Sequence, residues 1–423
     1  MKKIMVGQGG GPTTVINDTL AGIILESQRY GIELIGSKNG LEGGGLNPEV
    51  DGNLVDLTGI SPESIRGIPG AYLGTTRLKL EPGIDDDLIQ KIQDNIRELG
   101  VDAFLYIGGN DTASTLSAMN NGIHVQKTVD NDLPGNDHTS GFGSASRANA
   151  EIIKSLVLDT SGFSPRISYQ GRIVYSTAPV VVYQTQGRNA GWLTLGVAFA
   201  KVNGGGQVIE DNAPHLFLPR EIPFDERLLL DEVDNILSRS GYAFIAVGEE
   251  LVLEDGITTL AEFYKANGTT DRHGNTENAR SGSFSHSDAV ADIIKNNLRV
   301  DSNSYLNVKE TPIKIDHIQR SLYRTLTDAN EAFGAGREAV RAFMDGQLNV
   351  SIALLREGVE GYHIRPGRIP LSTVADQVRK VDSRYLGDIH GPTDQFFNDF
   401  MPLVMGRTQI KRHSGPVLPQ YIR

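Results

Sequence analysis

The segment KTVDND, residues 127–132, sets two carboxylates close together. Asp130 and Asp132 are separated by one residue and follow a lysine, Lys127, and a hydroxyl, Thr128. Carboxylates at a strand end can act as a general base or hold Mg²⁺, which prefers oxygen ligands. The alternative is a solvated acidic turn before the proline that follows. The motif alone leaves both interpretations open.

Two glycine-rich turns are the second chemical signal. Residues 9–11 are three glycines and residues 108–109 are two, and each group follows a short apolar run. A glycine turn between a strand and a helix can hold phosphate through backbone N–H groups and the positive end of the helix. Either turn alone fits a tight connection, but two favour a phosphate ligand. Neither is a P-loop, because no Gly-Lys-Ser/Thr follows.

The elements that position these residues follow an α/β pattern, in which apolar runs alternate with helical periodicity. Around the first turn we expect a strand at 3–6 and a helix at 16–30. Around the second we expect a helix whose apolar residues are Ile84, Leu88, Ile89, Ile92, Ile96 and Leu99, a C-cap at Gly100, a strand at 103–107, a turn at 108–111 and a helix at 112–120. Further strands are expected at 173–174, 180–183 and 243–247, a surface loop at 267–287 and a helix at 288–298.

Composition excludes several classes of protein. A chain of 423 residues is too long for one ordinary domain, and its net charge of -12 argues against non-specific nucleic-acid binding. The absence of cysteine excludes disulfides, thiolate catalysis and Cys-ligated metal sites. No apolar stretch is long enough to span a membrane, and the N-terminal segment does not have the pattern of a signal peptide. We therefore expect a soluble, cytoplasmic protein.

Seven segments in order resemble the phosphofructokinase family: GGGPTTVIN, LGTTR, GGNDT, KTVDNDLPGNDHTSGFGSA, QGRNAGWL, VGEE and HIQR. The resemblance covers most of the chain. It implies an α/β fold of two Rossmann-like lobes with mostly parallel sheets and the active site in the cleft between them. It further implies a phosphoryl-donor lobe of residues 1–141 and about 320–375, and a sugar-phosphate lobe of about 142–319 and 376–423.

The resemblance also assigns catalytic roles. Asp130 is similar to the family's base, which takes the proton from the sugar 1-hydroxyl so that this oxygen can attack phosphorus. Asp132 corresponds to a residue that supports the metal and substrate, and Thr128 to one that contacts the transferring phosphoryl group. The expected cofactor is Mg²⁺, with Asn110 and Asp111 as ligands. Asn110 stands where the family usually has an aspartate, and it brings an amide oxygen without charge.

For the phosphoryl donor, the resemblance assigns Gly10, Gly11, Arg77, Gly108, Gly109, Asp111 and Lys127. ATP users of the family have a small residue where this chain has Asp111. A carboxylate there takes up volume and repels a third phosphate, at a cost on the order of 1–4 kcal/mol. Lys127 is typical of pyrophosphate users and would bind the small donor as a point charge. The expected donor is pyrophosphate, and the expected reaction is reversible.

For the sugar phosphate, the resemblance assigns Gln186, Gly187, Arg188, Glu249, Lys314, His317 and Arg320. Arginine can hold a terminal phosphate through two hydrogen bonds. Without the family, Arg188 and Arg320 would be read as surface salt bridges, Glu249 as a solvated strand end, His317 as a hydrogen-bonded strand residue and Lys314 as an exposed strand lysine. Gln186 replaces a methionine usual in the family.

The expected reaction is transfer from pyrophosphate to fructose 6-phosphate, by a homodimer or homotetramer. One alternative is an ATP-dependent 6-phosphofructokinase, which Asp111 disfavours. Another is a kinase acting on a different sugar phosphate, because Gln186 departs from the family pattern. A third is an inactive paralogue that binds sugar phosphate, which the presence of Asp130, Asp132 and Thr128 together disfavours.

Overall fold

The computed structural model describes residues 1–163, 167–169, 172–174, 178–260, 262, 269–270, 276–277, 285–301, 304–305, 313–314, 317–358 and 361–409. The chain forms two compact units. Unit 1 consists of Met1–Ala145, Arg320–Arg379 and Asp399–Arg423, and unit 2 of Ser146–Gln319 and Lys380–Asn398. Three of the four boundaries fall within α5 (Phe142–Phe163), α10 (Gln319–Leu322) and α12 (Asp394–Val404), and the fourth lies between Arg379 and Lys380.

The division differs from the expected lobes chiefly in the C-terminal segment. The sequence assigned residues 376–423 to the second lobe, whereas residues 376–379 and 399–423 belong to unit 1. The physical reason is packing by the second half of α12. The ring of Phe400 lies 5.6 Å from that of Phe142, and Leu403 packs against Gly143.

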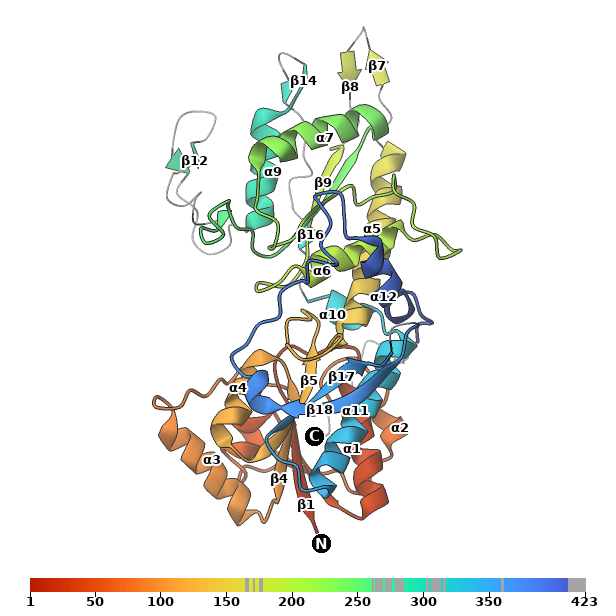
Figure 1. The fold of residues 1–423 in the computed structure, drawn as a ribbon. Helices are drawn as coiled ribbons and strands as arrows, with labels where there is room; N and C mark the ends of the chain where they lie inside the picture. The colour runs from red at the N-terminus through yellow and green to blue at the C-terminus, as the bar shows by residue number, and fades with distance from the viewer. Residues whose placement is uncertain are drawn as a thin grey trace. The chain divides into compact units, whose positions relative to one another are not determined.

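Among the described residues, unit 1 is built on an eight-stranded sheet in the order β18-β17-β5-β4-β1-β2-β3, with β6 paired to β5 (Figure 1). The central strands β17, β5, β4, β1 and β2 are parallel, and β18 and β3 pair antiparallel at the two edges. The carboxyl ends of β1, β4 and β5 therefore meet at one edge of the sheet, where α/β folds place their ligands. The strands are β1 (Lys3–Gln8), β2 (Glu33–Ser37), β3 (Leu54–Asp56), β4 (Ala103–Gly108), β5 (Gly122–Thr128), β6 (Ser140–Gly141), β17 (Val350–Arg356) and β18 (Ile364–Pro370).

Helices cover both faces of this sheet, because alternate residues of a strand point to opposite sides. Ile4 and Val6 belong to the core cluster formed with α1 and α11, whereas Met5 belongs to the cluster formed with α3 and α4. The helical segments of unit 1 are α1 (Ile16–Tyr30), η1 (Leu41–Gly45), α2 (Pro62–Ile65), α3 (Asp86–Glu98), α4 (Asn110–Met119), α11 (Leu326–Met344) and η3 (Leu371–Thr373).

Helices α1 and α11 cross at two glycines. Gly22 lies against the carbonyl group of Phe333, and Gly336 lies against the carbonyl group of Thr19. A Cβ atom at either glycine would overlap these backbone atoms, so the close approach of the two helices requires both glycines. The sequence patterns did not reveal this crossing.

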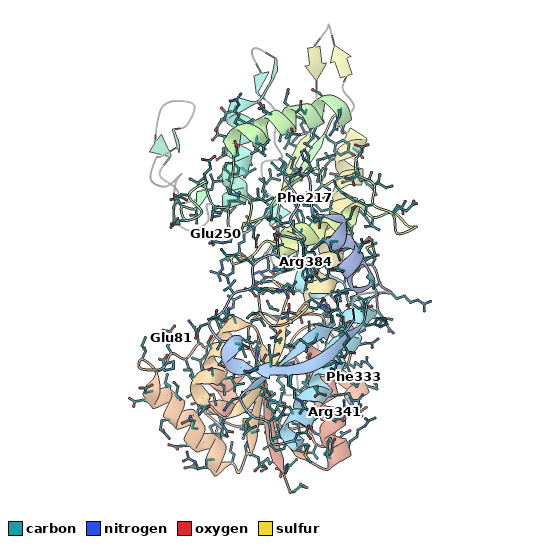
Figure 2. The ribbon with its side chains drawn as sticks, in the orientation of Figure 1. Glu81, Phe217, Glu250, Phe333, Arg341 and Arg384 are labelled. Carbon is teal, nitrogen blue, oxygen red and sulfur yellow. The ribbon has the colours of Figure 1, made fainter. Side chains whose placement is uncertain are left out.

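Charged side chains reinforce the same helix pair. Glu26 of α1 accepts hydrogen bonds from the Nε atoms of Arg337 (2.7 Å) and Arg341 (2.8 Å) of α11. Burial alone would raise the pKa of the Glu26 carboxyl, but the two arginines outweigh it and lower that pKa. Figure 2 labels Arg341 and Phe333 on α11, and the guanidinium of Arg66 lies over the Phe333 ring at 4.3 Å.

A histidine is buried between two carboxylates in the interior of unit 1. The ring of His138 is fully buried between two carboxylates, with Nδ1 2.8 Å from Asp137 and Nε2 2.9 Å from Glu331. Arg356 pairs with Asp137 at 2.6 Å, and the Tyr362 hydroxyl donates to Glu331 at 2.8 Å. Burial alone would lower the pKa of His138, but Glu331 and Asp137 together raise it to about 10. The imidazole is therefore cationic in the folded protein.

Unit 2 is built on a parallel sheet in the order β10-β11-β9-β16, from β9 (Val180–Gln184), β10 (Leu216–Leu218), β11 (Ala243–Val247) and β16 (Ile313–Lys314). Its core joins β9, β10 and β11 to α7 (Glu226–Ser240) and α9 (His286–Asn297). α6 (Trp192–Gly196) and η2 (Val197–Lys201) follow β9. Three antiparallel pairs are β7–β8 (Ile167–Tyr169, Arg172–Val174), β12–β13 (Thr269–Thr270, Thr276–Glu277) and β14–β15 (Arg299–Asp301, Ser304–Tyr305).

The predicted α/β class with mostly parallel sheets is confirmed, and several elements match closely. The predicted helix 16–30 and strand 243–247 have the observed bounds. Ile84 was wrongly assigned to an apolar helix face, because α3 begins at Asp86 and Ile84 is exposed. Most of the expected loop 267–287 lies outside the described residues. Within the part of the chain that is described, no helix has the length and apolar character needed to span a membrane.

Candidate active site

The first glycine turn continues directly from β1. The Gly9 amide donates to Ile107 O at 2.8 Å, and the Gly10 amide donates to Thr76 O at 2.9 Å. These two N–H groups are therefore used inside the fold. Gly10 has a φ of 71°, in the left-handed region that favours glycine. The turn thus owes any affinity for anions chiefly to the side chains around it.

The second glycine turn is shorter than the sequence suggested. Gly108 is the last residue of β4, Gly109 caps α4, and the helix begins at Asn110. Asn110 and Asp111 therefore lie in the first helical turn and not before the helix, which corrects the predicted start at residue 112. A negative ligand near them would meet the positive end of the helix dipole.

Thr112 joins the two glycine turns. A Cβ atom at Gly9 would lie 2.6 Å from Thr112 Oγ1, and a Cβ atom at Gly108 would overlap the same side chain. Both positions therefore need glycine for packing. Gly109, in contrast, has room around it, since the nearest atoms to its Cβ position, on Lys127 and Thr128, lie at 3.8 Å.

Lys127 lies beneath the first glycine turn. Its Nζ atom donates to Gly9 O at 3.0 Å and to Gly11 O at 2.7 Å, and the side chain is 2% exposed. Burial lowers the pKa of Lys127 to about 7, with help from the positive charges of Arg320 and Arg77 and against the effect of Asp130. The lysine predicted to contact the donor is thus also a structural part of the turn.

Arg320 belongs to the same cluster. A side chain at Gly11 would overlap the Arg320 guanidinium, which fixes this arginine against the glycine turn in unit 1. The sequence assigned Arg320 to the sugar phosphate, and its contact with Gly11 was not foreseen. Arg77 is exposed and follows Thr76, whose carbonyl accepts the Gly10 amide. Lys127 and Arg320 therefore lie against this turn, and Arg77 follows a residue that is bonded to it.

The loop that carries the predicted base follows β5. The Asp130 amide donates to Thr128 Oγ1 at 3.1 Å, so the two candidate catalytic residues are in contact. Asn131 has a φ of 56°, and its Oδ1 accepts from the Thr139 amide at 2.8 Å. Asp132 is buried, and its carbonyl accepts the Arg379 amide at 2.7 Å. These bonds hold the two carboxylates in a defined loop and not in a solvated turn.

In unit 2, the predicted sugar-phosphate residues lie at the carboxyl ends of neighbouring strands. β9 and β11 are parallel partners that end at Gln184 and Val247. The Gly187 amide donates to Glu249 Oε2 at 3.1 Å, and Arg188 Nε lies 3.6 Å from Glu249 Oε1. Gly187 has a φ of 113°. Gly187, Arg188 and Glu249 are therefore brought together as expected.

The remaining predicted residues are placed less completely. Gln186 is 7% exposed, whereas the Arg188 side chain is 72% exposed and accessible to a ligand. Lys314 of β16 pairs with Gln184 of β9, at the carboxyl-terminal edge of the sheet where Glu249 also lies. The side chain of Lys314 is outside the described part of the structure. His317 is exposed in a turn.

Glu221 is a residue that the sequence motifs missed. Its two carboxylate oxygens accept the Gly191 amide at 3.1 and 3.0 Å, and its Oε1 also accepts the Val381 amide at 2.9 Å. A partly buried carboxylate that accepts two backbone N–H groups from different segments fixes these segments together. Glu221 thus holds the loop that carries Arg188, and no local pattern around it indicates this role.

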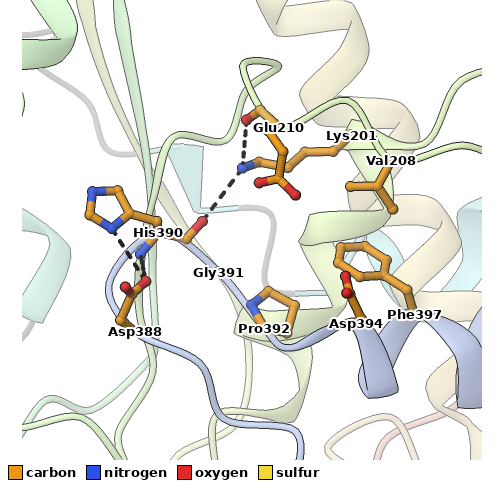
Figure 3. A pocket seen from close by; sticks show the side chains of 9 residues that line it. All are labelled: Lys201, Val208, Glu210, Asp388, His390, Gly391, Pro392, Asp394 and Phe397. Atoms are coloured by element: carbon orange, nitrogen blue, oxygen red, sulfur yellow. Dashed lines mark hydrogen bonds and ion pairs between the residues drawn. The ribbon is translucent and has the colours of Figure 1, made fainter.

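A separate cavity of about 250 Å³ lies in unit 2 (Figure 3). The Lys201 Nζ atom at its wall donates to Glu210 O at 3.0 Å and to His390 O at 3.5 Å. None of the predicted site residues lines it. This cavity is therefore distinct from the residues assigned to the reaction.

Two residues at the start of α4 carry oxygen atoms of the kind that magnesium prefers. Asn110 Nδ2 donates to Gln377 O at 2.7 Å, which identifies the opposite atom of the amide, Oδ1, as the available ligand. Asp111, in the same helical turn, adds a carboxylate. In the described part of the chain there is no group of three or more acidic or histidine residues that could hold a metal. Mg²⁺ often needs only one or two protein oxygens, because substrate phosphates and water supply the rest.

The chain is similar in sequence to a known protein family and to named proteins of that kind. The family model described as Phosphofructokinase matches residues 3–343. A protein of Rhodospirillum rubrum named pyrophosphate–fructose 6-phosphate 1-phosphotransferase is 30% identical, over 95% of this chain and 94% of its own length. A sulfofructose kinase of Alkalicoccus urumqiensis is 26% identical, over 88% and 89%.

The fold has similar solved structures. The crystal structure of a pyrophosphate-dependent phosphofructokinase from Nitrosospira multiformis matches with a TM-score of 0.77. The match covers all of this chain and 96% of the other, at 24% sequence identity. This likeness concerns the arrangement of the backbone.

Proposed function

Because the chain belongs to the phosphofructokinase family, we propose that it transfers a phosphoryl group from pyrophosphate to the 1-hydroxyl of fructose 6-phosphate. The products are fructose 1,6-bisphosphate and phosphate, and the reaction is reversible and Mg²⁺-dependent. Unit 1 binds the donor and unit 2 binds the sugar phosphate. The name of the Rhodospirillum rubrum relative supports both substrates.

The observation that carries this proposal is the cluster of cations around the first glycine turn. Lys127 lies beneath the turn and Arg320 lies against Gly11, on a turn whose residues Gly10 and Gly11 carry no side chain. Such a cluster suits a compact polyanion. Asp111 at the start of α4 disfavours a donor with a third phosphate, which supports pyrophosphate over ATP.

In the proposed mechanism, Asp130 accepts the proton of the sugar 1-hydroxyl as that oxygen forms a bond to phosphorus. The bridging P–O bond of pyrophosphate breaks, and the leaving phosphate keeps the bonding electrons. Thr128 contacts the transferring group, while Lys127 and Arg320 offset its charge. Phosphoryl transfer depends mainly on such positioning and charge neutralisation.

Asn110 Oδ1 and Asp111 would hold Mg²⁺, with Asp132 in support. When bound, the ion neutralises the phosphate oxygens and withdraws charge from the bridging oxygen. In unit 2, Gly187, Arg188 and Glu249 would bind the sugar phosphate. Gln186, Lys314 and His317 complete the proposed set.

Two further substrates deserve comparison in the same assay. The sulfofructose kinase relative acts, by its name, on another acceptor, and Gln186 departs from the family pattern. ATP remains the alternative donor.

An inactive paralogue is disfavoured because the loop that carries Asp130 and Asp132 is held by specific hydrogen bonds. We also propose a homodimer or homotetramer located in the cytoplasm.

The test is the initial rate with fructose 6-phosphate and Mg²⁺, with pyrophosphate or ATP as donor. Turnover with pyrophosphate alone would support the full assignment. Turnover with ATP alone would overturn the assignment of pyrophosphate as donor and would leave the assignment of fructose 6-phosphate as acceptor unchanged. If neither donor supports turnover, the acceptor assignment fails, and other sugar phosphates are assayed next.

A further inference from the structure

A short segment late in the chain, residues 376–379, lies against both functional loops of unit 1. It follows η3, and its start is anchored by Leu371 and Val374, which are buried in the same core cluster as Ala113 and Leu116 of α4. The amide of Gln377 donates back to Val374 O at 3.2 Å. The segment is therefore fixed to the core before it reaches the loops.

On one side, the segment binds the first turns of α4. Gln377 O accepts from Asn110 Nδ2 at 2.7 Å. Ser114 Oγ donates to Asp376 Oδ1 at 2.8 Å and accepts the Asp376 amide at 3.1 Å. Asp376 has a φ of 57°, a conformation that costs free energy for a residue other than glycine and that these bonds help to hold.

On the other side, the segment binds the loop that carries Asp130 and Asp132. The Arg379 amide donates to Asp132 O at 2.7 Å. The Nη1 atom of the Arg379 side chain lies 2.7 Å from Asn136 O, 2.5 Å from Asn136 Oδ1 and 2.9 Å from Asp137 O. One guanidinium nitrogen thus contacts three acceptors on the far side of the same loop.

The sheet itself does not hold these loops together at this point. The last paired residues of β4 and β5 are Gly108 and Gln126, and the residues proposed for metal and base lie beyond them. Beyond the last paired residues of the two strands, the position of the Asp130 loop relative to the start of α4 depends on bonds such as those made by the 376–379 segment. A misplacement of about 1 Å between reacting groups can lower a rate about 10²-fold.

We propose that the 376–379 segment sets the distance between the donor and metal residues of α4 and the base Asp130. Arg379 and Ser114 are then positioning residues, one for each side. This inference rests on the proposed function. It assigns a role in the reaction to residues more than 240 positions away from the loop in sequence.

The first test compares Arg379→Ala with Arg365→Ala, a matched control whose side chain is 67% exposed on β18 of the same unit. We expect Arg379→Ala to lower kcat roughly 10–100-fold with the KM for fructose 6-phosphate within about threefold. Guanidinium ion at low millimolar concentration should restore part of the rate in Arg379→Ala only. Arg379→Lys, which keeps the charge, provides a second variant in case the alanine variant does not fold.

The second test is a double-variant cycle with Ser114→Ala. If the segment acts as a unit, the fold-decrease in kcat of the double variant is much smaller than the product of the fold-decreases of the two single variants. Simple multiplication of the losses, or a kcat for Arg379→Ala within twofold of wild type, would overturn the inference.

Hydrogen exchange of the backbone amides in residues 130–137 tests the positioning role separately from the proposed function, because it does not depend on turnover. Arg379→Ala should speed their exchange, whereas Arg365→Ala should not. If the wild-type protein shows no turnover, the proposed function fails, and unchanged exchange in Arg379→Ala would independently overturn the positioning role.

Discussion

The Nζ atom of Lys127 lies 2.7 Å from the carbonyl oxygen of Gly11 and 3.0 Å from that of Gly9. The ammonium group has three donors, and these bonds use two of them. The same charge that orders the turn therefore lies next to the proposed donor position. The neutral amine keeps two N–H donors and can still make both bonds, so the titrating proton affects the binding of an anionic donor more than the structure of the turn.

The first prediction concerns pH. Because the pKa of Lys127 is lowered to about 7, the free enzyme loses this charge as pH rises above 7. The KM for pyrophosphate should be constant below pH 7 and should rise above it, by up to roughly tenfold per pH unit. Initial rates from pH 6 to 8.5 measure this, with the KM for fructose 6-phosphate as a reference.

Lys127→Met is the matched variant for that measurement. Its KM for pyrophosphate should be high at every pH. Pyrophosphate itself ionises in this range, so the slope that matters is the difference between wild type and variant. Parallel profiles would remove Lys127 from donor binding.

The second prediction tests the base. Asp130→Ala should lower kcat roughly 10²–10⁴-fold with a modest effect on KM, as expected when a general base is lost. Asp87→Ala, at an exposed position on α3, is the control and should be near wild type. Nearly full turnover by Asp130→Ala would exclude it from the chemistry.

The third prediction concerns donor choice. Asp111→Gly should raise the ratio of kcat/KM for ATP to that for pyrophosphate, because it removes both the volume and the charge at the start of α4. Asp111→Asn removes the charge and keeps the size, so the two variants separate the effects. If the ratio is unchanged in both, the donor is selected elsewhere.

The fourth prediction concerns the helix crossing. Gly336→Ala should destabilise the protein by roughly 1–3 kcal/mol, because the new methyl group overlaps the carbonyl of Thr19 and the helices must move apart. Urea unfolding measures the change. Gly162→Ala on α5, where a Cβ meets open space, should be neutral or slightly stabilising. Equal stability of both variants would contradict the crossing.

The fifth prediction follows from His138. Its pKa is raised from 6.5 to about 10 on folding, so the native state binds this proton more tightly than the unfolded state. The stabilisation is fully present below pH 6.5 and is lost as pH rises through about 10, with a slope of up to about 1.4 kcal/mol per pH unit. Urea unfolding at pH 6, 8 and 9.5 measures it.

His138→Gln isolates this effect, since other groups also titrate in the range. The variant should be less stable at pH 6 and should lose less stability on going to pH 9.5. The same slope in both proteins would mean that His138 is neutral in the native state.

The sequence predicted the glycine turns and the strands before them, because glycine and apolar periodicity act locally. It placed the start of α4 two residues late, since Asn110 and Asp111 read as turn residues while the helix dipole and the Gly109 cap favour a helix there. It assigned Arg188 and Glu249 to one sugar-phosphate site only through the family resemblance, and their ion pair was not predicted.

What the sequence did not predict depends on contacts between distant residues. Arg379 binds the loop at Asn136, and Arg320 lies against Gly11, and neither pairing leaves a local pattern. The burial of Lys127 was missed for the same reason, because a lysine before two aspartates reads as a solvent-exposed charge.

The crossing of α1 and α11 also has a consequence for synthesis on the ribosome. α1 ends at Tyr30 and α11 begins at Leu326, almost 300 positions later in the chain, and β17 and β18 of the same sheet come later still. At about 5–20 residues per second, roughly 15–60 s pass between the emergence of α1 and that of its partner. During this interval the surface around Gly22 has no native cover. Unit 1 therefore cannot complete its core during translation until most of the chain has been made.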